Sequence, residues 1–357
     1  MTARSSYVEL QNITRGLRRT TLPVLPPAFG FDGDVDYMEQ LDLWKRWIQW
    51  EKDDPLVLKQ EDIAAYRARI VFVYKQALMA MRFWPELWFD AADFCFVNDL
   101  ADIGNEFLTQ GIAANPESCV LAFKRGDRIE LTTANEEGDE SAKRRGAAVR
   151  ECYDKVLNSL YDLISKAKDR ETQDVARIEA HFAADAEQNA NDMQENDNDE
   201  DRNDEESESK EKRKTAQIEA VKNVNSVQVR LLTKTISFVW IALMRAIRRI
   251  QGKGKVGDPI GGSRQIFTDA RKRGRITSDV YVASALIEFH CYEPEATKKI
   301  FERGLKLFPE DEAFALEYIR HLIANNDHTS KTSSSSLLST SIVLIELQMR
   351  ESFLKLS

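Results

Sequence analysis

Apolar residues recur along this chain at steps of three and four positions, the spacing of one face of an α-helix. From Met38 to Glu51, the positions Leu41, Trp44, Trp47 and Ile48 share such a face. Glycine and proline are sparse, 15 and 9 among 357 residues, and they fall between the helical stripes. The pattern therefore predicts helices along nearly the whole chain.

The helical stripes also repeat at longer distances. Trp44 and Trp88 are 44 residues apart, and Ile266-Phe267 recurs as Ile300-Phe301 after 34 residues. Periods in this range are typical of solenoids built from helix pairs. We predict five pairs and one unpaired helix from Glu312 to Asn325. The pairs begin near Asp36, Glu86, Glu117, Val221 and Ser278, with second helices near Asp62, Leu100, Gly146, Ser263 and Glu295.

Proline marks the borders between the predicted pairs. Trp84-Pro85-Glu86, Asn115-Pro116-Glu117 and Phe308-Pro309-Glu310 each stand where a second helix ends and the next first helix starts. Proline tolerates the start of a helix because its missing N–H needs no partner there, and glutamate favours the same position.

The predicted domains follow the composition. Residues 1–34 read as a linker and helix end, and residues 35–184 and 215–327 as repeats. Between the repeats, residues 185–214 are acidic and contain almost no large apolar side chains, so we expect a disordered insertion. Residues 328–357 form a divergent, serine-rich tail.

Short signatures add a resemblance to a known family. Leu43-Trp44-x-x-Trp47-x-x-Trp50-Glu51 and Ile300-Phe301-x-x-Gly304-Leu305 resemble half-a-TPR repeats, found chiefly in RNA-processing scaffolds. Together with the linker from Leu17 to Pro23, they resemble the suppressor-of-forked family, the large scaffold subunits of cleavage stimulation factor. The match runs from about Tyr7 to about Asp327.

The resemblance implies a fold and a function. The fold would be an all-α, right-handed α-solenoid, and the function a non-catalytic scaffold for pre-mRNA 3′-end cleavage and polyadenylation. Its partners would be the other subunits of that complex, with a homodimer through the C-terminal half. Scaffolds of splicing or ribosome assembly use the same repeats and remain the alternative. Family members carry further repeats before this sequence and further segments after it, so we expect part of a longer protein.

Composition narrows the remaining functions. The net charge of −9 is concentrated in one acidic block and says little about partners. Cys95, Cys119, Cys152 and Cys291 stand far apart, and the histidines lack metal spacing. We therefore expect no enzyme, cofactor, metal or small-molecule substrate. The N-terminus carries charges throughout, and no apolar run has the length of a membrane span, so we expect no membrane.

The repeated aromatic residues have two interpretations. They fill the contacts between neighbouring helices, or they line a peptide-binding groove. We assign the core to the signature residues and expect Trp50 and Trp84 to be the more exposed anchors. The assigned core residues are Trp44, Trp47, Trp88, Trp240, Tyr281 and Phe301.

Basic residues cluster between Arg245 and Arg275, where two predicted helices meet. They form either a surface for RNA phosphates or an acidic partner, or a solvated helix face. No aromatic RNA-recognition signature accompanies them, so base-specific reading is not expected. The candidate surface comprises Arg245, Arg248, Arg249, Lys253, Lys255, Arg271, Lys272 and Arg273, with Arg264 and Arg275 beside them.

Two shorter motifs complete the sequence reading. The glycines from Gly252 to Gly262 lack the strand and the Gly-Lys-Ser/Thr ending of a phosphate loop, so they predict a turn between helices. Lys210-x-Lys212-Arg213-Lys214 is a candidate nuclear-localisation patch, with a chance basic run as the alternative. We expect the protein in the nucleus, with the cytoplasm as a second compartment.

Overall fold

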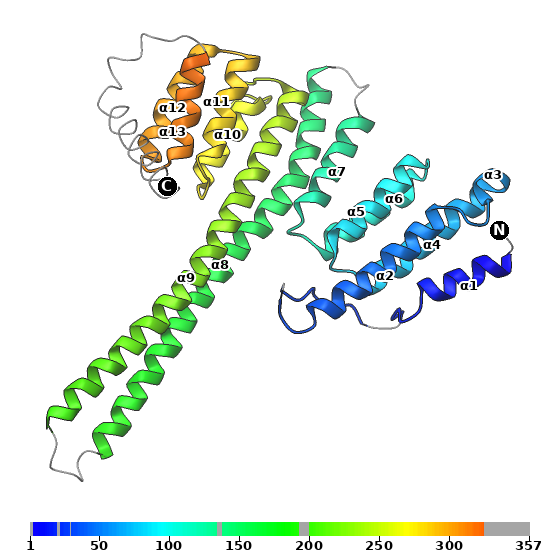
Figure 1. The fold of residues 1–357 in the computed structure, drawn as a ribbon. Helices are drawn as coiled ribbons and strands as arrows, with labels where there is room; N and C mark the ends of the chain where they lie inside the picture. The colour runs from blue at the N-terminus through cyan, green and yellow to red at the C-terminus, as the bar shows by residue number, and fades with distance from the viewer. Residues whose placement is uncertain (1–2, 20–21, 29, 134–137, 193–199, 325–357) are drawn as a thin grey trace, which may run out of the picture. The chain divides into compact units, whose positions relative to one another are not determined.

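The computed structural model describes the chain apart from residues 1–2, 20–21, 29, 134–137, 193–199 and 325–357, with the backbone alone for 186–208 (Figure 1). About 80% of the chain is helical, and the described residues contain no strand. The predicted all-α fold class is confirmed, while the right-handed sense of the solenoid stays a prediction. The helices form two compact units, residues 1–137 with 147–159, and residues 138–146 with 160–357.

The first unit is a stack of antiparallel helix pairs. Two second helices, α4 and α6, begin where the sequence predicts, whereas α8, expected near Gly146, begins at Asp139. The Asp62 carboxylate caps α4 by accepting from the backbone N–H groups of Ala64 and Ala65 at 3.1 and 3.0 Å. Pro85 occupies the first turn of α5. The helices are α1 (Ala3–Ile13), α2 (Asp34–Lys52), α3 (Leu58–Glu61), α4 (Ile63–Ala80), α5 (Pro85–Val97), α6 (Ala101–Ala114) and α7 (Cys119–Thr132), joined by part of α8 (Asp139–Asp192).

One apolar core runs through α2, α4 and α5. Leu41, Trp44, Ile70, Tyr74 and Ala91 are fully buried in it, and their three- and four-residue spacing places them on the inward face of each helix. Stacking of neighbouring pairs therefore buries the stripes that the sequence shows.

The second unit combines two long helices with four shorter ones. α9 packs against α10 and α11, and α11 packs against α12. The last helix, α13, buries Phe314 and Tyr318 and leaves Leu316 and Ile323 exposed. The helices here are α9 (Glu200–Gln251), α10 (Gly262–Arg273), α11 (Asp279–Cys291), α12 (Pro294–Leu307) and α13 (Glu312–Ala324).

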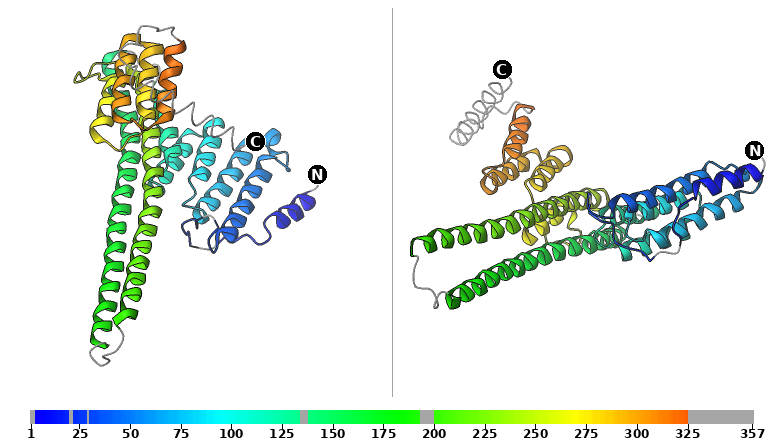
Figure 2. Two further views of the ribbon diagram at one scale, coloured as in Figure 1. Left: turned by 60° about the vertical axis from the view of Figure 1, so that its left-hand side comes forward. Right: turned by 60° about the horizontal axis from the view of Figure 1, so that its bottom comes forward.

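The long helices α8 and α9 run antiparallel, side by side in every view (Figures 1 and 2). Two hydrogen bonds fix their register. The Trp240 Nε1–H donates to the Tyr161 hydroxyl at 3.3 Å, and the Gln251 side-chain amide donates to the Ala142 carbonyl at 3.3 Å. Tyr161 in turn donates to the Gly274 carbonyl at 2.7 Å, which ties the end of α10 to the hairpin.

The structure differs from the predicted disordered insertion over residues 185–214. The backbone is helical to Asp192 and again from Glu200, so α9 starts well before Val221. The stretch contains no glycine or proline and is rich in Glu, Gln, Lys and Arg, which favour helix even without a core to pack on. Residues 193–199 and the predicted tail at 328–357 lie outside the described residues.

The glycine-rich stretch forms the turn between α9 and α10, as predicted. Gly254 has φ of 64° and Gly262 has φ of 58°, which a side chain would strain. A Cβ on Gly254 would also lie 2.1 Å from the Gly261 carbonyl carbon, so both positions need glycine.

By length and composition alone, the segment Ser209–Gln251 of α9 could cross a membrane, with a mean hydropathy of 1.4 over an 18-residue window. Its side chains Ile236, Val239, Trp240 and Leu243 are nevertheless buried in the second unit. Part of the apolar surface of α9 therefore packs within the second unit.

Candidate protein-docking surfaces

The structure places the signature aromatic residues in the interior. Trp44, Trp47, Trp88, Trp240, Tyr281 and Phe301 are all buried. The expectation that Trp50 is an exposed anchor is wrong, because this side chain also packs into the core of the first unit. Trp84 is half-buried, with its ring 6.0 Å from that of Tyr37. None of these residues offers a free aromatic anchor.

The N-terminal linker is fastened to α2. The Arg18 guanidinium donates to the Asp36 carboxylate at 2.8 Å, and its backbone N–H donates to Gln40 at 2.9 Å. The neighbouring Arg19 guanidinium lies 4.6 Å from the ring centre of Trp47. The Arg-Arg pair of the linker motif therefore has a structural role against the first helix.

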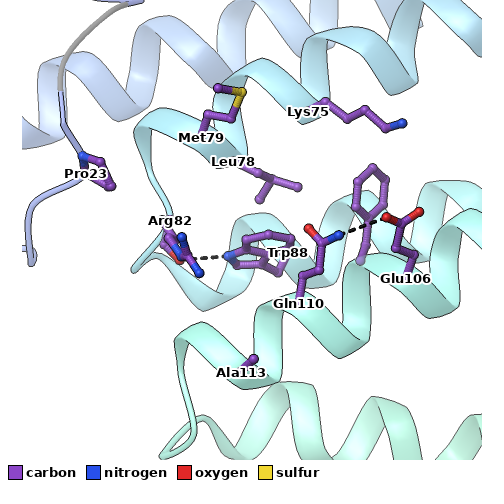
Figure 3. Close-up of a pocket in the computed structure, with 10 residues that line it drawn as sticks. Pro23, Lys75, Leu78, Met79, Arg82, Trp88, Glu106, Gln110 and Ala113 are labelled. Atoms are coloured by element: carbon purple, nitrogen blue, oxygen red, sulfur yellow. Dashed lines mark hydrogen bonds between the residues drawn. The ribbon is translucent and has the colours of Figure 1, made fainter.

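A groove opens between α4 and α6 in the first unit. It consists of two hollows of about 620 and 420 Å³ that meet at Lys75, and we call it the α4–α6 groove. Figure 3 shows one half: Lys75, Leu78 and Met79 project from α4, and Glu106 and Gln110 lie on α6. The walls are mainly apolar with charged groups at intervals, the composition common in binding grooves.

The base of the groove is held rigidly. The Trp88 indole N–H of α5 donates to the Arg82 carbonyl at 2.8 Å (Figure 3). The Asn115 amide donates to the same oxygen at 3.1 Å. A Cβ on Gly111 would lie 2.9 Å from Trp88, so glycine lets α6 approach the indole closely. Asn115, at the start of the Asn-Pro-Glu border, therefore helps to hold this end of the groove.

Two large apolar side chains of α4 line the groove without being buried. Phe72 is 57% exposed and Met79 is 69% exposed. Sequence reasoning missed both, because the stripe that it followed on α4 is the buried one. Their separation of seven residues, which places them on one side of the helix, was the available signal.

Several residues of the predicted basic surface interact with other side chains of the second unit. Arg264 donates to both oxygens of Glu288 at 2.6 and 2.7 Å, and Lys253 pairs with Glu293. Other members lie against neighbouring groups: the Arg273 guanidinium is 4.0 Å from the Tyr161 ring centre, and Arg271 is 5.4 Å from that of Phe267. The Arg248 guanidinium lies 3.4 Å from the Cys291 sulfur.

The other members face solvent. The side chains of Arg245, Arg249, Lys255 and Lys272 are exposed, as is Arg275 beside them. The cluster is therefore part structural and part solvated, and its role as a binding surface stays a prediction.

Burial changes the pKa of several titratable groups in the first unit. Burial raises the pKa of the Cys95 and Cys119 thiols to about 11 each, which keeps them protonated at neutral pH. Burial, followed by a hydrogen bond to Asp90, raises the pKa of Tyr74. Within the described ranges, no three His, Cys, Asp or Glu side chains are grouped as a metal site requires.

The comparisons with known proteins identify the family. The family model for suppressor of forked protein matches residues 1–349. The chain is 63% identical over 327 residues to the mRNA 3′-end-processing protein rna14 of Aspergillus oryzae, covering 92% of this chain and 30% of that protein. It is 48% identical over 343 residues to the protein of that name from Neurospora crassa, covering 92% and 28%.

A more distant relative extends the same pattern. The rna14 protein of Schizosaccharomyces pombe is 26% identical over 335 residues, covering 92% of this chain and 37% of that protein. The chain thus spans about a third of the length of these relatives. By the match along nearly its whole length, the chain belongs to the suppressor-of-forked family.

Proposed function

We propose that this chain is part of a non-catalytic scaffold that assembles the pre-mRNA 3′-end cleavage and polyadenylation machinery. The relatives described above are named mRNA 3′-end-processing proteins, which is the observation that carries the proposal. Scaffolds of splicing or ribosome assembly are the alternative from the repeat class, and none of these relatives carries such a name.

The architecture supports a binding role. Helix-pair stacks offer extended surfaces rather than one enclosed site, so several partners can bind one chain. The α4–α6 groove is one such surface. The partners would be other subunits of the processing complex and, through the C-terminal half, a second copy of the chain. We place this work in the nucleus, with residues 210–214 of α9 as the candidate import signal.

An extract assay tests the function. Depletion of the endogenous protein from a nuclear extract should abolish cleavage of a polyadenylation substrate and leave splicing of a control transcript intact. Return of the purified endogenous protein should restore cleavage. Intact cleavage together with lost splicing would favour the alternative scaffold.

Direct RNA binding is a second candidate, supported by the exposed basic side chains of the second unit, Arg245, Lys255 and Lys272. Such contacts would be electrostatic, so retention on homopolymeric RNA should fall steeply as salt rises. Replacement of the three residues by glutamine should remove the retention. Absence of retention at low salt would exclude this candidate.

A further inference from the structure

The α4–α6 groove has the form of a trough for a helix. The face of α4 that lines it extends from Ala64 to Met79, about 22 Å at the rise of an α-helix, and Arg82 follows just past the end of the helix. Phe72 and Met79 stand along this face one heptad apart, and Ile103 lies on the opposite wall from α6. A partner helix of roughly 15 residues would match this length, and one further turn would reach Arg82.

The charges of the groove are unequal. Its walls carry three basic side chains, Arg67, Lys75 and Arg82, and one acidic side chain, Glu106. Arg67 lies 3.4 Å from the Asp99 carboxylate, and Glu106 accepts a hydrogen bond from Gln110 at 2.9 Å. Among the described residues, Lys75 and Arg82 have no carboxylate of the chain within ion-pairing distance. The groove therefore favours a negatively charged ligand.

We propose that the α4–α6 groove docks an acidic amphipathic helix of a partner protein. Its apolar side chains would pack on Phe72 and Met79, and its carboxylates would pair with Lys75 and Arg82. A helix binds in such a groove through apolar anchor residues at three- and four-residue spacing. The charges that flank the anchors determine which helix is selected. The inference rests on the proposed scaffold function, because it assigns to that scaffold the chemistry of one partner.

Two other occupants fit the groove less well. RNA would place phosphates beside the basic groups, but the exposed Phe72 and Met79 side chains lie between them and gain little from a phosphate backbone. A second copy of the chain would have to present a helix with an acidic and an apolar face. The exposed apolar residue Leu316 of α13 does not fit this requirement, because it lies in a separate hollow beside the basic side chain of Arg320. Both alternatives are outcomes of the test.

Peptide binding to the purified 357-residue chain provides the test. The probe is a fluorescein-labelled helical peptide of roughly 18 residues, with leucine at three- and four-residue steps and glutamate elsewhere. A second peptide keeps the leucines and replaces each glutamate by lysine. Anisotropy should show the acidic peptide binding about tenfold or more tightly than the basic one.

Variants of the chain locate the site. Met79→Asp should weaken the acidic peptide about tenfold, the effect of losing a central apolar anchor. Lys75→Glu should weaken the acidic peptide and strengthen the basic one. The matched control is Val97→Asp, since Val97 is an exposed apolar residue of α5 outside the groove. Its binding should equal that of the parent, and circular dichroism checks that each variant is folded.

Several results would overturn the proposal. Equal binding of the two peptides would show that the charges of the groove do not select the ligand. Equal effects of Met79→Asp and Val97→Asp would show that the peptide does not bind in the groove. If the chain self-associates and Met79→Asp abolishes this self-association, the occupant of the groove is a second copy of the chain. If the chain binds a uridine oligomer, and Lys75→Glu abolishes this binding while Met79→Asp leaves it intact, the occupant of the groove is RNA. Failure of peptide binding leaves the extract assay unaffected, so the two proposals fail separately.

Discussion

The ion pair between Arg264 and Glu288 provides a quantitative test of the second unit. Glu288 of α11 is only 4% exposed, and both of its carboxylate oxygens accept hydrogen bonds from Arg264 of α10. Removal of one partner from a buried pair leaves an uncompensated charge, which costs about 3–5 kcal/mol. Because the Arg264 side chain is 30% exposed, we expect Arg264→Met to lie near the lower end, at about 3 kcal/mol.

The double variant separates the pair from its neighbours. Arg264→Met with Glu288→Leu removes both charges and supplies apolar volume, an exchange that is often neutral or stabilising. We therefore expect the double variant to be more stable than Arg264→Met alone by about 2 kcal/mol, with a clearly non-additive cycle. The contact of Arg264 with Glu293 contributes little because that carboxylate is solvent-exposed.

Urea unfolding measured by hydrogen–deuterium exchange of α11 peptides is the appropriate assay. Five of the six tryptophans lie in the first unit, so total fluorescence would report mainly on that unit. Lys272→Met, an exposed site on the same helix, is the matched control and should stay within about 0.5 kcal/mol of the parent. An effect of Arg264→Met no larger than this control, or strictly additive single effects, would refute the buried-pair argument.

Three further predictions concern packing. Trp44→Ala and Trp88→Ala should each destabilise the first unit by about 3–5 kcal/mol in urea, because both indoles are buried, and parent-like midpoints would contradict the core assignment. Gly304→Ala should destabilise the second unit by about 1–2 kcal/mol, because the new Cβ would lie 2.2 Å from the Phe314 ring. We expect this overpacking to cost more than alanine gains in helix propensity, and a stabilised variant would show that the ring moves freely. Amide exchange should be faster in residues 210–222 of α9 than in residues 236–250, because only the latter carry a dense buried face, and equal protection would contradict this.

The helix pairs were predictable because one physical rule produces both pattern and structure. A helix that buries one face must repeat apolar residues every three or four positions, and Trp44, Ile70 and Phe301 all follow this spacing into the interior. Proline between repeats marked the helix ends for the same local reason.

Features that depend on contacts between distant residues were not predictable. The sequence places Arg264 in a basic surface, but its guanidinium pairs with the carboxylate of Glu288, 24 residues later. The α4–α6 groove arises from the separation of two helices, which no local pattern encodes. The acidic stretch was misjudged because low apolar content argues against a core but not against a helical backbone.

Affinity purification of the endogenous protein from nuclear extract, followed by quantitative mass spectrometry, tests the central claim most directly. The account predicts recovery of subunits of the cleavage and polyadenylation complex in near-stoichiometric amounts, resistant to ribonuclease because protein contacts hold a scaffold together. Recovery of splicing or ribosome-assembly factors in their place, or of the protein alone, would contradict it.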